Sequence, residues 1–447
     1  PNEVLLPALV QQGAGRYALI AEAGVDASYA GSHLLADPLD AGRYSYLLPR
    51  ASETTAQGPM ESGDPLPVEV ELPFASPWRV AVLGDAGTIA TTDMLNGLAV
   101  LQLGTKRFDW VRPGHAAWSW LTENASPGDF DRQRSYIDFA AANDWPYVVV
   151  DEGWRDVQTE VPALVRYARE RGVGIVLWLN KRELDTPEER RRDFALFERW
   201  GVRGLKVDFF DDESRATMRL VETIARAAAR REIMLNLHGF GVPRGIQLEW
   251  PNIVTFEGVR GAEYYYLSED FAGLVPAPNP EHNTILPFTR QPMGPMDYTP
   301  VTFDAPNRIT GDAHELALAV VQESGILHPA DSIEAYEQRP NVTAMLGGMP
   351  TAWRGIRFIE GAPGRSITIA RRARRGSWWI GSINAGAART VTVPLRFLAK
   401  GKWATTIAVE APGPDVGLRT KLVDRRDVLR LEQEANGGSV VRLVRKG

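Results

Sequence analysis

The chain has 447 residues, which is enough for two or three domains. It is 44% hydrophobic and 24% charged, a composition typical of soluble globular proteins. Its net charge of −6 excludes a strongly basic protein built to bind nucleic acid or acidic membranes. The absence of cysteine excludes disulfides and thiolate metal sites, and no apolar run is long enough to span a membrane.

Residues 1–103 have the pattern of short β-strands. The segments 17–22 and 78–83 are strand-like, and Gly, Pro and Ser gather in the breaks at 52–66 and 73–77. We therefore expect an all-β segment, the N-terminal portion of a β-sandwich. It holds too few strands to be a complete sandwich, so this domain is expected to be truncated.

From about residue 104 the pattern changes to an alternation of strands and helices. Apolar runs predict strands at 147–151, 174–179, 205–210, 233–237 and 253–256. Between them, apolar residues recur at helical spacing over 161–171, 187–200 and 214–230. Repeated strand–helix units with buried parallel strands indicate either a doubly wound sheet or a (β/α)8 barrel.

Polar residues at the strand ends favour the barrel. Each predicted strand is followed or closed by a polar side chain at its carboxyl end: Asp151, Asn180, Asp208, His238 and Glu257. Polar groups gathered at those ends are typical of a barrel active site. A doubly wound sheet would instead lead us to expect a Gly-rich phosphate turn after its first strand, and the sequence has none there. We therefore predict a central (β/α)8, TIM-like barrel over residues 104–354.

The remaining segments complete a prediction of three domains. Residues 267–311 are rich in Pro, Asn and Asp and predict a long functional loop. A helix around 312–322 is expected to close the barrel. Strand-like runs at 366–370, 377–381 and 391–395 predict a C-terminal β-sandwich domain over residues 355–447.

Asp208 and Glu263 form the carboxylate pair on which the functional prediction depends. Each lies at or just beyond the end of an apolar run, so both are expected at one rim of the barrel. Glycoside hydrolysis needs two such acids. Lys206 lies on the same strand face as Asp208 and favours its ionised form, which suits a nucleophile. The alternative is that Asp208 caps the following helix, although Asp211 or Asp212 would fit that role better.

Four further residues are candidates for the same site. Of Glu257 and Glu263, one is a general acid/base and the other a metal ligand or positioning group, unless both belong to a solvated loop. His238 is either a substrate hydrogen-bonder or a base. His282, in the long loop, either binds substrate or fixes the loop. Glu22 ends an apolar strand, where a buried acid needs a partner, and a calcium ion shared with Glu257 is one option.

Short motifs along the chain occur in the order typical of one enzyme family. They are 136–141 (YIDFAA), 151–154 (DEGW), 200–210 (WGVRGLKVDFF), 238–239 (HG), 250–252 (WPN), 256–263 (FEGVRGAE), 282–290 (HNTILPFTR) and 294–300 (GPMDYTP). With these residues the chain resembles glycoside hydrolase family 97 over essentially its whole length. The resemblance implies a β-supersandwich, a (β/α)8 barrel and a C-terminal β-domain, in agreement with the pattern above.

The family has two mechanistic branches. Retaining members, typified by α-galactosidases, carry an Asp nucleophile at the position of Asp208. Inverting members, typified by α-glucosidases, lack it and place a base Glu directly after the His that corresponds to His238. Here that next residue is Gly239, so both positions indicate the retaining branch.

The resemblance also implies the roles of other residues. The general acid/base falls on Glu263, and the family's calcium site falls on Glu22 and Glu257. Substrate-binding roles are expected for Asp151, Trp154, Lys206, His238 and His282. The implied reaction is a double displacement through a glycosyl-enzyme.

Three features depart from the family pattern. Ser119, in the aromatic run 118–121, replaces an acidic residue, which puts the identity of the sugar in doubt. The run 247–250 (QLEW) replaces a more basic pattern. The N-terminal β-segment is shorter than the family's, so either the chain is a fragment or a second chain supplies the missing strands.

The favoured function is a retaining, exo-acting α-galactosidase, or a hydrolase of a close stereochemical relative such as an α-linked arabinopyranoside. The alternatives are an inverting α-glucosidase-like hydrolase, which Gly239 argues against, and an inactive carbohydrate-binding protein, which Asp208 and Glu263 argue against. A transglycosidase is compatible with the same residues. The expected partner is a galactoside or oligosaccharide, with no nucleic acid and no membrane. Family analogy implies a periplasmic or secreted location, although the N-terminus shows no signal peptide.

Overall fold

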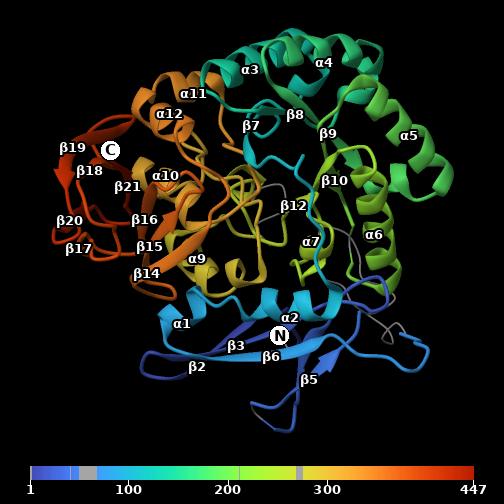
Figure 1. Ribbon diagram of the computed structural model, residues 1–447, viewed down its shortest axis with the longest axis horizontal. Helices are drawn as coiled ribbons and strands as arrows, with labels where there is room; N and C mark the ends of the chain where they lie inside the picture. The colour runs from blue at the N-terminus through green and yellow to red at the C-terminus, as the bar shows by residue number, and fades with distance from the viewer. Residues whose placement is uncertain (1–2, 41, 50–67, 211, 268–274, 447) are drawn as a thin grey trace.

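The computed structural model describes residues 3–40, 42–49, 68–210, 212–267 and 275–446. A central barrel is flanked by N-terminal β-sheets below and a C-terminal β-domain to the left (Figure 1). The predicted break at 52–66, the alternative cap Asp211 and part of the predicted long loop lie outside the described residues. Within them, no helix is long and apolar enough to cross a membrane.

Seven parallel strands form the barrel sheet, in the order β12-β11-β10-β9-β8-β7-β13. They are β7 (Gly114–Trp118), β8 (Tyr147–Val150), β9 (Gly174–Asn180), β10 (Gly204–Asp208), β11 (Met234–Leu237), β12 (Ile253–Phe256) and β13 (Ile326–Leu327). Six of the seven are neighbours in chain order, each joined to the next by a helical crossover, as the strand–helix pattern predicted. The barrel-like fold is therefore confirmed.

An irregular segment fills the gap between β12 and β13, where a regular barrel would have another strand. Asp297 N donates to Phe256 O on β12 at 2.7 Å, and Met296 N donates to Glu323 O at 2.7 Å. Prolines occur at positions 292, 295 and 300 of this run. Because proline has no N–H to donate, the run cannot form a continuous strand ladder.

Three of the four long barrel helices lie where helical spacing predicted them. The outer layer contains α3 (Phe130–Ala142), which was not predicted, and the three predicted helices α4 (Val161–Glu170), α5 (Pro187–Trp200) and α6 (Arg215–Ala229). Helix α5 begins with a capping box, in which Thr186 Oγ1 accepts from Glu189 N at 3.2 Å. It ends at Gly201, whose φ of 84° suits a glycine cap. Shorter helices in the connections are α7 (Ile246–Glu249), α8 (Tyr264–Leu267), α11 (Ile333–Glu337) and α12 (Pro340–Gly347).

The N-terminal part forms two three-stranded sheets, with the orders β1-β4-β5 and β2-β3-β6. Their strands are β1 (Glu3–Val4), β2 (Ala8–Gly13), β3 (Arg16–Ala23), β4 (His33–Ala36), β5 (Tyr44–Leu47) and β6 (Trp78–Gly84). The expectation of an all-β segment was wrong at its end, where α1 (Ala86–Ala90) and α2 (Met94–Leu103) form. Both are short and largely apolar, so they carry no clear amphipathic period, and they lie between the sheets and the barrel (Figure 1).

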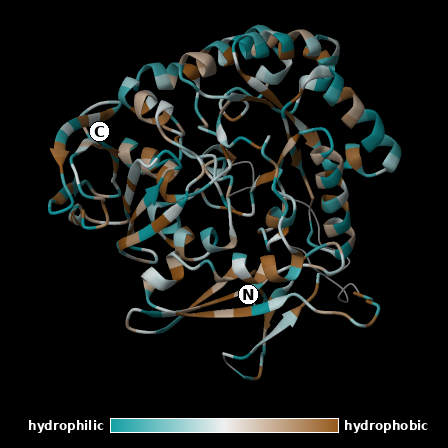
Figure 2. Ribbon diagram, viewed as in Figure 1, coloured by the Kyte–Doolittle hydropathy of each residue, from teal (hydrophilic) through white to brown (hydrophobic). Residues whose placement is uncertain are grey.

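Apolar side chains are unusually exposed on this N-terminal part. Of the 17 exposed large apolar side chains on the described residues, 12 lie before residue 104. Trp78 on β6 is 43% exposed and Leu83 is 70% exposed. Brown, apolar residues run along these strands in Figure 2. An N-terminal part with so many exposed apolar side chains is a candidate surface for contact with further protein.

The C-terminal domain packs two sheets around its own apolar core. Its six-stranded sheet has the order β14-β15-β16-β21-β18-β19, and β17 pairs with β20. The strands are β14 (Gly355–Ala362), β15 (Ser366–Arg372), β16 (Trp378–Asn384), β17 (Arg389–Pro394), β18 (Trp403–Glu410), β19 (Val416–Val423), β20 (Val428–Gln433) and β21 (Gly438–Arg445). Helix α10 (Asp312–Val321) lies against β16 and β21, and α9 (Pro280–Ile285) gives partial order to the predicted long loop.

A buried ion cluster ties the N-terminal sheet to the barrel. Glu22 on β3 is fully buried and accepts hydrogen bonds from Ser32 N at 2.9 Å, from Ser32 Oγ at 2.9 Å and from Arg79. Arg244, in the connection between β11 and β12, places its Nε 3.0 Å from Glu22 Oε2. Arg244 also pairs with Glu213. The carboxylate of Glu22 therefore joins two guanidinium groups across the domain boundary.

Replacing Glu22 by alanine is expected to lower the free energy of unfolding by about 3–5 kcal/mol, because it leaves buried arginine charge uncompensated. The measurement is urea denaturation of the whole chain, followed through its first transition. The matched control is Asp109→Ala, which breaks an ion pair to Arg107 in which both side chains are more than 80% exposed. That control should change the free energy by no more than about 1 kcal/mol. Equal losses in the two variants would contradict the role given to Glu22.

Candidate active site

The polar residues predicted at the strand ends gather at the carboxyl rim of the barrel. Asp151 follows β8, Asp208 ends β10, and His238 and Glu257 follow β11 and β12. The strand ladder continues past the last two, since His238 N donates to Val207 O at 2.8 Å and Glu257 N donates to Leu237 O at 2.9 Å. Asn180 is the exception, because its side chain caps the 3-10 turn Lys181–Leu184.

Asp208 is held by two hydrogen bonds at the end of β10. Its Oδ1 accepts from Phe209 N at 2.6 Å, and its Oδ2 accepts from the indole of Trp178 at 3.1 Å. Phe209 has a φ of 62°, a left-handed conformation that non-glycine residues rarely adopt. The strand therefore ends at Asp208, two residues before the predicted end at Phe210, and the carboxylate is fixed at the rim.

Gly239 leaves the space that Asp208 occupies. A Cβ at position 239 would lie 2.9 Å from Asp208 Oδ1 and 2.7 Å from Phe209 N. The φ of Gly239 is also positive, at 56°. Any side chain at 239 would therefore require Asp208 and its neighbour to move. This contact gives a steric reason why Asp208 occurs together with a glycine directly after His238.

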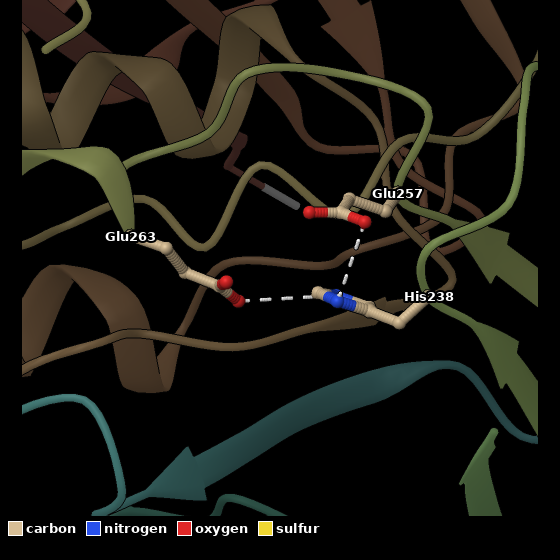
Figure 3. Close-up of side chains that lie close together, drawn as sticks. All are labelled: His238, Glu257 and Glu263. Carbon is tan, nitrogen blue, oxygen red and sulfur yellow. Dashed lines mark ion pairs between the residues drawn. The ribbon is translucent and has the colours of Figure 1, made fainter. Parts of the chain in front are cut away.

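His238 is a buried cation surrounded by carboxylates. Its Nε2 lies 3.0 Å from Asp297 Oδ2 and 4.0 Å from Glu263 Oε1. Its Nδ1 lies 3.6 Å from Glu257 Oε2 and 3.9 Å from Asp208 Oδ2. Figure 3 shows the imidazole between the two glutamates. Burial and a nearby lysine lower the pKa of His238, but these carboxylates outweigh them and raise it to about 10.

Glu263 has the properties of a general acid. Its Oε1 is buried and has no hydrogen-bond partner among the described residues. Burial raises the pKa of Glu263 to about 7, with Lys206 and His238 opposing the rise and Glu257 and Asp208 adding to it. A carboxyl group with this pKa is protonated over part of the neutral range, as a general acid must be.

Glu257 is tied to the backbone beside His238. Its Oε2 accepts from Gly239 N at 2.8 Å, and its side chain contacts His238. Burial raises the pKa of Glu257, and the charge of His238 opposes this. Of the two roles left open for Glu257 and Glu263 by the residues alone, the geometry gives Glu257 the positioning role.

Lys206 and Asp151 form a buried pair on the floor of the site. Lys206 Nζ donates to Asp151 Oδ2 at 3.0 Å, and the indole of Trp118 donates to the same oxygen at 2.8 Å. Lys206 Nζ also lies 4.0 Å from Glu263 Oε1. Burial lowers the pKa of Lys206, but Asp151, Glu263 and other carboxylates outweigh it and keep the amine charged. Asp151 thus acts mainly by holding Lys206 and Trp118 in place.

Asp297 and His328 belong to the site but were not predicted. Asp297 lies in the irregular segment and accepts from Asn236 at 2.6 Å, from His238 and from His328 Nδ1 at 2.8 Å. The histidines hold the pKa of Asp297 well below its usual range, against the effect of burial. His328 follows the two-residue strand β13, and its Nε2 is buried without a hydrogen-bond partner among the described residues. The strand-end rule would have found it had so short a strand been recognised.

Three residues singled out from the sequence lie away from the carboxylate cluster. Trp154 was expected to bind substrate, and this prediction was wrong. Its ring is fully buried against Phe197 and Trp200, and its N–H donates to Trp178 O at 2.7 Å. Its aromatic area serves the core behind β9. His282 contacts the backbone O of Arg260 at 2.9 Å, which fits the loop-fixing alternative.

Ser119, the third, turns away from the barrel mouth. Its Oγ accepts from Ser126 Oγ at 2.7 Å and from Gln133 at 2.9 Å, and its side chain is buried. The residue therefore supports the packing of α3 against the first strand of the barrel rather than facing the substrate space.

Glu22 does not fit the calcium role expected for it. Both of its oxygens already accept hydrogen bonds, and two guanidinium groups adjoin it. A calcium ion needs several free oxygen ligands, and its charge would be repelled by Arg79 and Arg244. The described residues whose ligand atoms do lie within 4.8 Å of one another are His238, Glu257 and Glu263.

The fold and the site place two carboxylates at the carboxyl end of a barrel, an arrangement typical of glycosidases. Three consecutive sequence families of glycoside hydrolase 97 match the chain. The N-terminal family matches residues 1–100, the glycoside hydrolase 97 family itself matches 110–259, and the C-terminal family, described as having a role in oligomerisation, matches 352–444. The chain belongs to glycoside hydrolase family 97.

Two curated relatives have similar sequences. A "probable retaining alpha-galactosidase" of Streptomyces bingchenggensis is 39% identical over 442 residues, which cover 95% of this chain and 64% of the relative. A "retaining alpha-galactosidase" of Bacteroides thetaiotaomicron is 29% identical, and the match covers 90% of this chain and 65% of the relative. The chain therefore spans slightly less than two thirds of the length of each.

Solved structures have the same fold. A beta-arabinopyranosidase superposes with a TM-score of 0.86 at 26% identity, over 98% of this chain and 71% of the other. A family 97 enzyme from Pseudoalteromonas sp. strain K8, in complex with acarbose, superposes with a TM-score of 0.83 at 23% identity, over 100% of this chain and 75% of the other.

The contact between Gly239 and Asp208 predicts the effect of a single methyl group. Gly239→Ala is expected to lower the free energy of unfolding by about 1–3 kcal/mol, because the new Cβ meets Asp208 and the φ is left-handed. The control is Gly97→Ala in α2, where a Cβ would have no atom within 4 Å. Alanine should stabilise that helix by up to about 1 kcal/mol. Urea denaturation measures both, and equal effects in the two variants would contradict the steric account.

Proposed function

We propose that the protein is a retaining, exo-acting α-galactosidase that hydrolyses terminal α-galactosides by double displacement. The observation that carries the proposal is the environment of the two carboxylates. Asp208 is fixed by Phe209 N and Trp178 at the rim, and Glu263 is buried with an unpartnered oxygen and a pKa raised to about 7. One group is prepared to attack and the other to donate a proton.

The curated relatives support the choice of sugar and of mechanism. Both are described as retaining α-galactosidases, and the first is 39% identical to this chain. The beta-arabinopyranosidase that shares the fold supplies a second candidate substrate, a pentopyranoside that resembles galactose. Galactose differs from such a sugar by its exocyclic CH₂OH, so the space around C5 of the bound ring would discriminate between the two.

In the first step, Asp208 attacks the anomeric carbon and forms the glycosyl-enzyme ester. Glu263 gives its proton to the glycosidic oxygen as the bond to the aglycone breaks, so the leaving group departs as a neutral alcohol. The charge of His238 lies within 4.0 Å of both carboxylates and partly balances the negative charge that moves between them.

In the second step, Glu263 is a carboxylate and takes a proton from water. The water oxygen attacks the same anomeric carbon, and Asp208 leaves as a free carboxylate. Two inversions restore the original configuration at that carbon. Lys206, which contacts Glu263 at 4.0 Å, favours the ionised form that this step requires.

The inverting alternative lacks the group that it needs. An inverting enzyme of this family uses a glutamate directly after the histidine, and position 239 has no room for any side chain beside Asp208. An inactive carbohydrate-binding protein would not need an unpartnered, buried carboxyl such as that of Glu263. A transglycosidase uses the same first step and differs only in the acceptor of the second.

Three narrower proposals accompany this function. Glu257 is the acid of this cluster that supplies a calcium ligand, and calorimetric titration of chelator-treated protein tests this by asking whether Glu257→Gln abolishes binding. Further β-structure, from this or a second chain, covers the exposed apolar side chains near Trp78 and Leu83.

The location of the protein is periplasmic or secreted, by family analogy, and cell fractionation tests it.

The anomer released first distinguishes retention from inversion. With p-nitrophenyl α-galactoside, proton NMR should show α-galactose before mutarotation produces the β-anomer. Asp208→Asn should lower kcat/KM at least about 1000-fold, because the nucleophile is lost. Asp212→Asn, four residues along, is the control and should retain activity within about tenfold. First release of β-galactose, or an active Asp208→Asn enzyme, would contradict the mechanism.

The raised pKa of Glu263 predicts the alkaline side of the pH profile. Because the acid must be protonated in the first step, kcat/KM should fall as the pH rises through about 7. Lys206 lowers this pKa, so Lys206→Met should move the fall to higher pH while also reducing activity. The exposed Lys421→Met serves as the control and should leave the profile unchanged. A fall at the same pH in both variants would contradict the assignment of Glu263.

A further inference from the structure

A large groove lies at the end of the barrel opposite the carboxylates. Its volume is about 1570 Å³. The residues lining it include Gly114 and His115 at the start of β7 and Pro146 just before β8. The opposite wall comes from the C-terminal domain, around β15 and β16. Since the carboxylate pair lies at the carboxyl ends of the strands, this groove and the catalytic site are separated by the length of the barrel.

The groove concentrates positive charge. Eight arginines line it, among them Arg357, Arg372, Arg374, Arg375, Arg425 and Arg445, and Asp144 is the one acidic residue among the described residues that line it. In the part of the chain that the structure describes, none of these eight arginines forms an ion pair with a carboxylate. The whole chain carries a net charge of −6, so this patch runs against the overall composition.

Buried polar atoms without partners lie in the same groove. The side chain of His115 is 4% exposed, and its Nε2 has no hydrogen-bond partner among the described residues. The Nε of Arg442, also in the lining, is buried in the same way. Buried groups of this kind are usually satisfied by water or by a ligand. Their position gives the groove a polar floor beneath its charged walls.

We propose that this groove binds a segment of an anionic polysaccharide. Guanidinium groups bind carboxylate and sulfate groups with paired hydrogen bonds, and a concave channel suits a chain. The choice of a glycan rests on the proposed function, since a polysaccharide that carries terminal α-galactosides would be held here while its ends reach the catalytic site. The groove would then raise the local concentration of long acidic substrates without touching the reacting sugar.

Two other occupants fit the groove less well. Proteins that bind single-stranded nucleic acid stack the bases on exposed aromatic rings. In this lining Trp378 and Trp403 are 9% and 3% exposed, and Phe358 and Phe397 are half-buried. A membrane surface is flat and calls for exposed apolar side chains at the rim. Among the described lining residues, Val444 is the one large apolar side chain that is substantially exposed, at 39%.

The test compares two triple variants of the full chain by calorimetric titration with polygalacturonate. The groove variant carries Arg372→Gln, Arg374→Gln and Arg375→Gln. Its control carries Arg166→Gln, Arg169→Gln and Arg199→Gln, which remove the same charge from exposed positions on α4 and α5. The wild type should bind polygalacturonate and not neutral dextran. Binding should weaken about tenfold in the groove variant and by no more than about twofold in the control.

The activity on p-nitrophenyl α-galactoside separates this proposal from the proposed function. Both triple variants should keep the wild-type kcat/KM within about twofold, because a small neutral substrate does not use the groove. A wild type that binds polygalacturonate through the groove but hydrolyses no α-galactoside would overturn the function and leave the binding site in place.

Three results would overturn the binding site itself. The first is unchanged polygalacturonate binding by the groove variant. The second is tighter binding of a single-stranded oligonucleotide than of polygalacturonate. The third is a wild-type dimer that the groove substitutions dissociate in sedimentation, which would make a second copy of the chain the occupant.

Discussion

The space beside Asp208 is the constraint on which the rest of the site depends. β10 and β11 bring Asp208 and Gly239 so close that a Cβ on the glycine would lie 2.9 Å from the carboxylate. The left-handed turn at Phe209 aims the carboxylate into this space. The carboxylate of Asp208 at the end of β10 therefore excludes a side chain at position 239, just after β11. A barrel of this kind can carry an acid at position 208 or at position 239, but not at both. The choice of mechanism follows from steric packing.

Electrostatic interactions then give different protonation states, and so different roles, to carboxylates that lie close together. Several acids in one buried space cannot all be ionised unless cations accompany them. His238 and Lys206 supply two fixed positive charges, and Asp297 holds His238 in its charged form. Glu263 lies 4.0 Å from each cation, which is too far for a hydrogen bond, so burial prevails and raises its pKa. The acid is thus a buried carboxyl that receives no hydrogen bond from either cation.

Most of the fold followed from periodicity, and much of the site followed from one rule about strand ends. Asp208 and Glu263 were predicted because regular strands precede them. Asp297 and His328 were missed because prolines replace one strand by an irregular run and β13 has only two residues. Trp154 was misplaced because a motif fixes a residue's position in the chain but not the side on which its ring packs. The helices α1 and α2 gave no period because they are apolar on nearly all sides.

The central claim is that Asp208 forms a covalent bond to the sugar. The most direct measurement is mass spectrometry after incubation with a fluorinated α-galactosyl fluoride, whose glycosyl-enzyme forms readily and hydrolyses slowly. The account predicts one added fluorogalactosyl group per chain, located by peptide mapping on Asp208 and absent from Asp208→Asn. A label on another carboxylate would contradict the account. So would an enzyme that hydrolyses α-galactosides but never acquires the label.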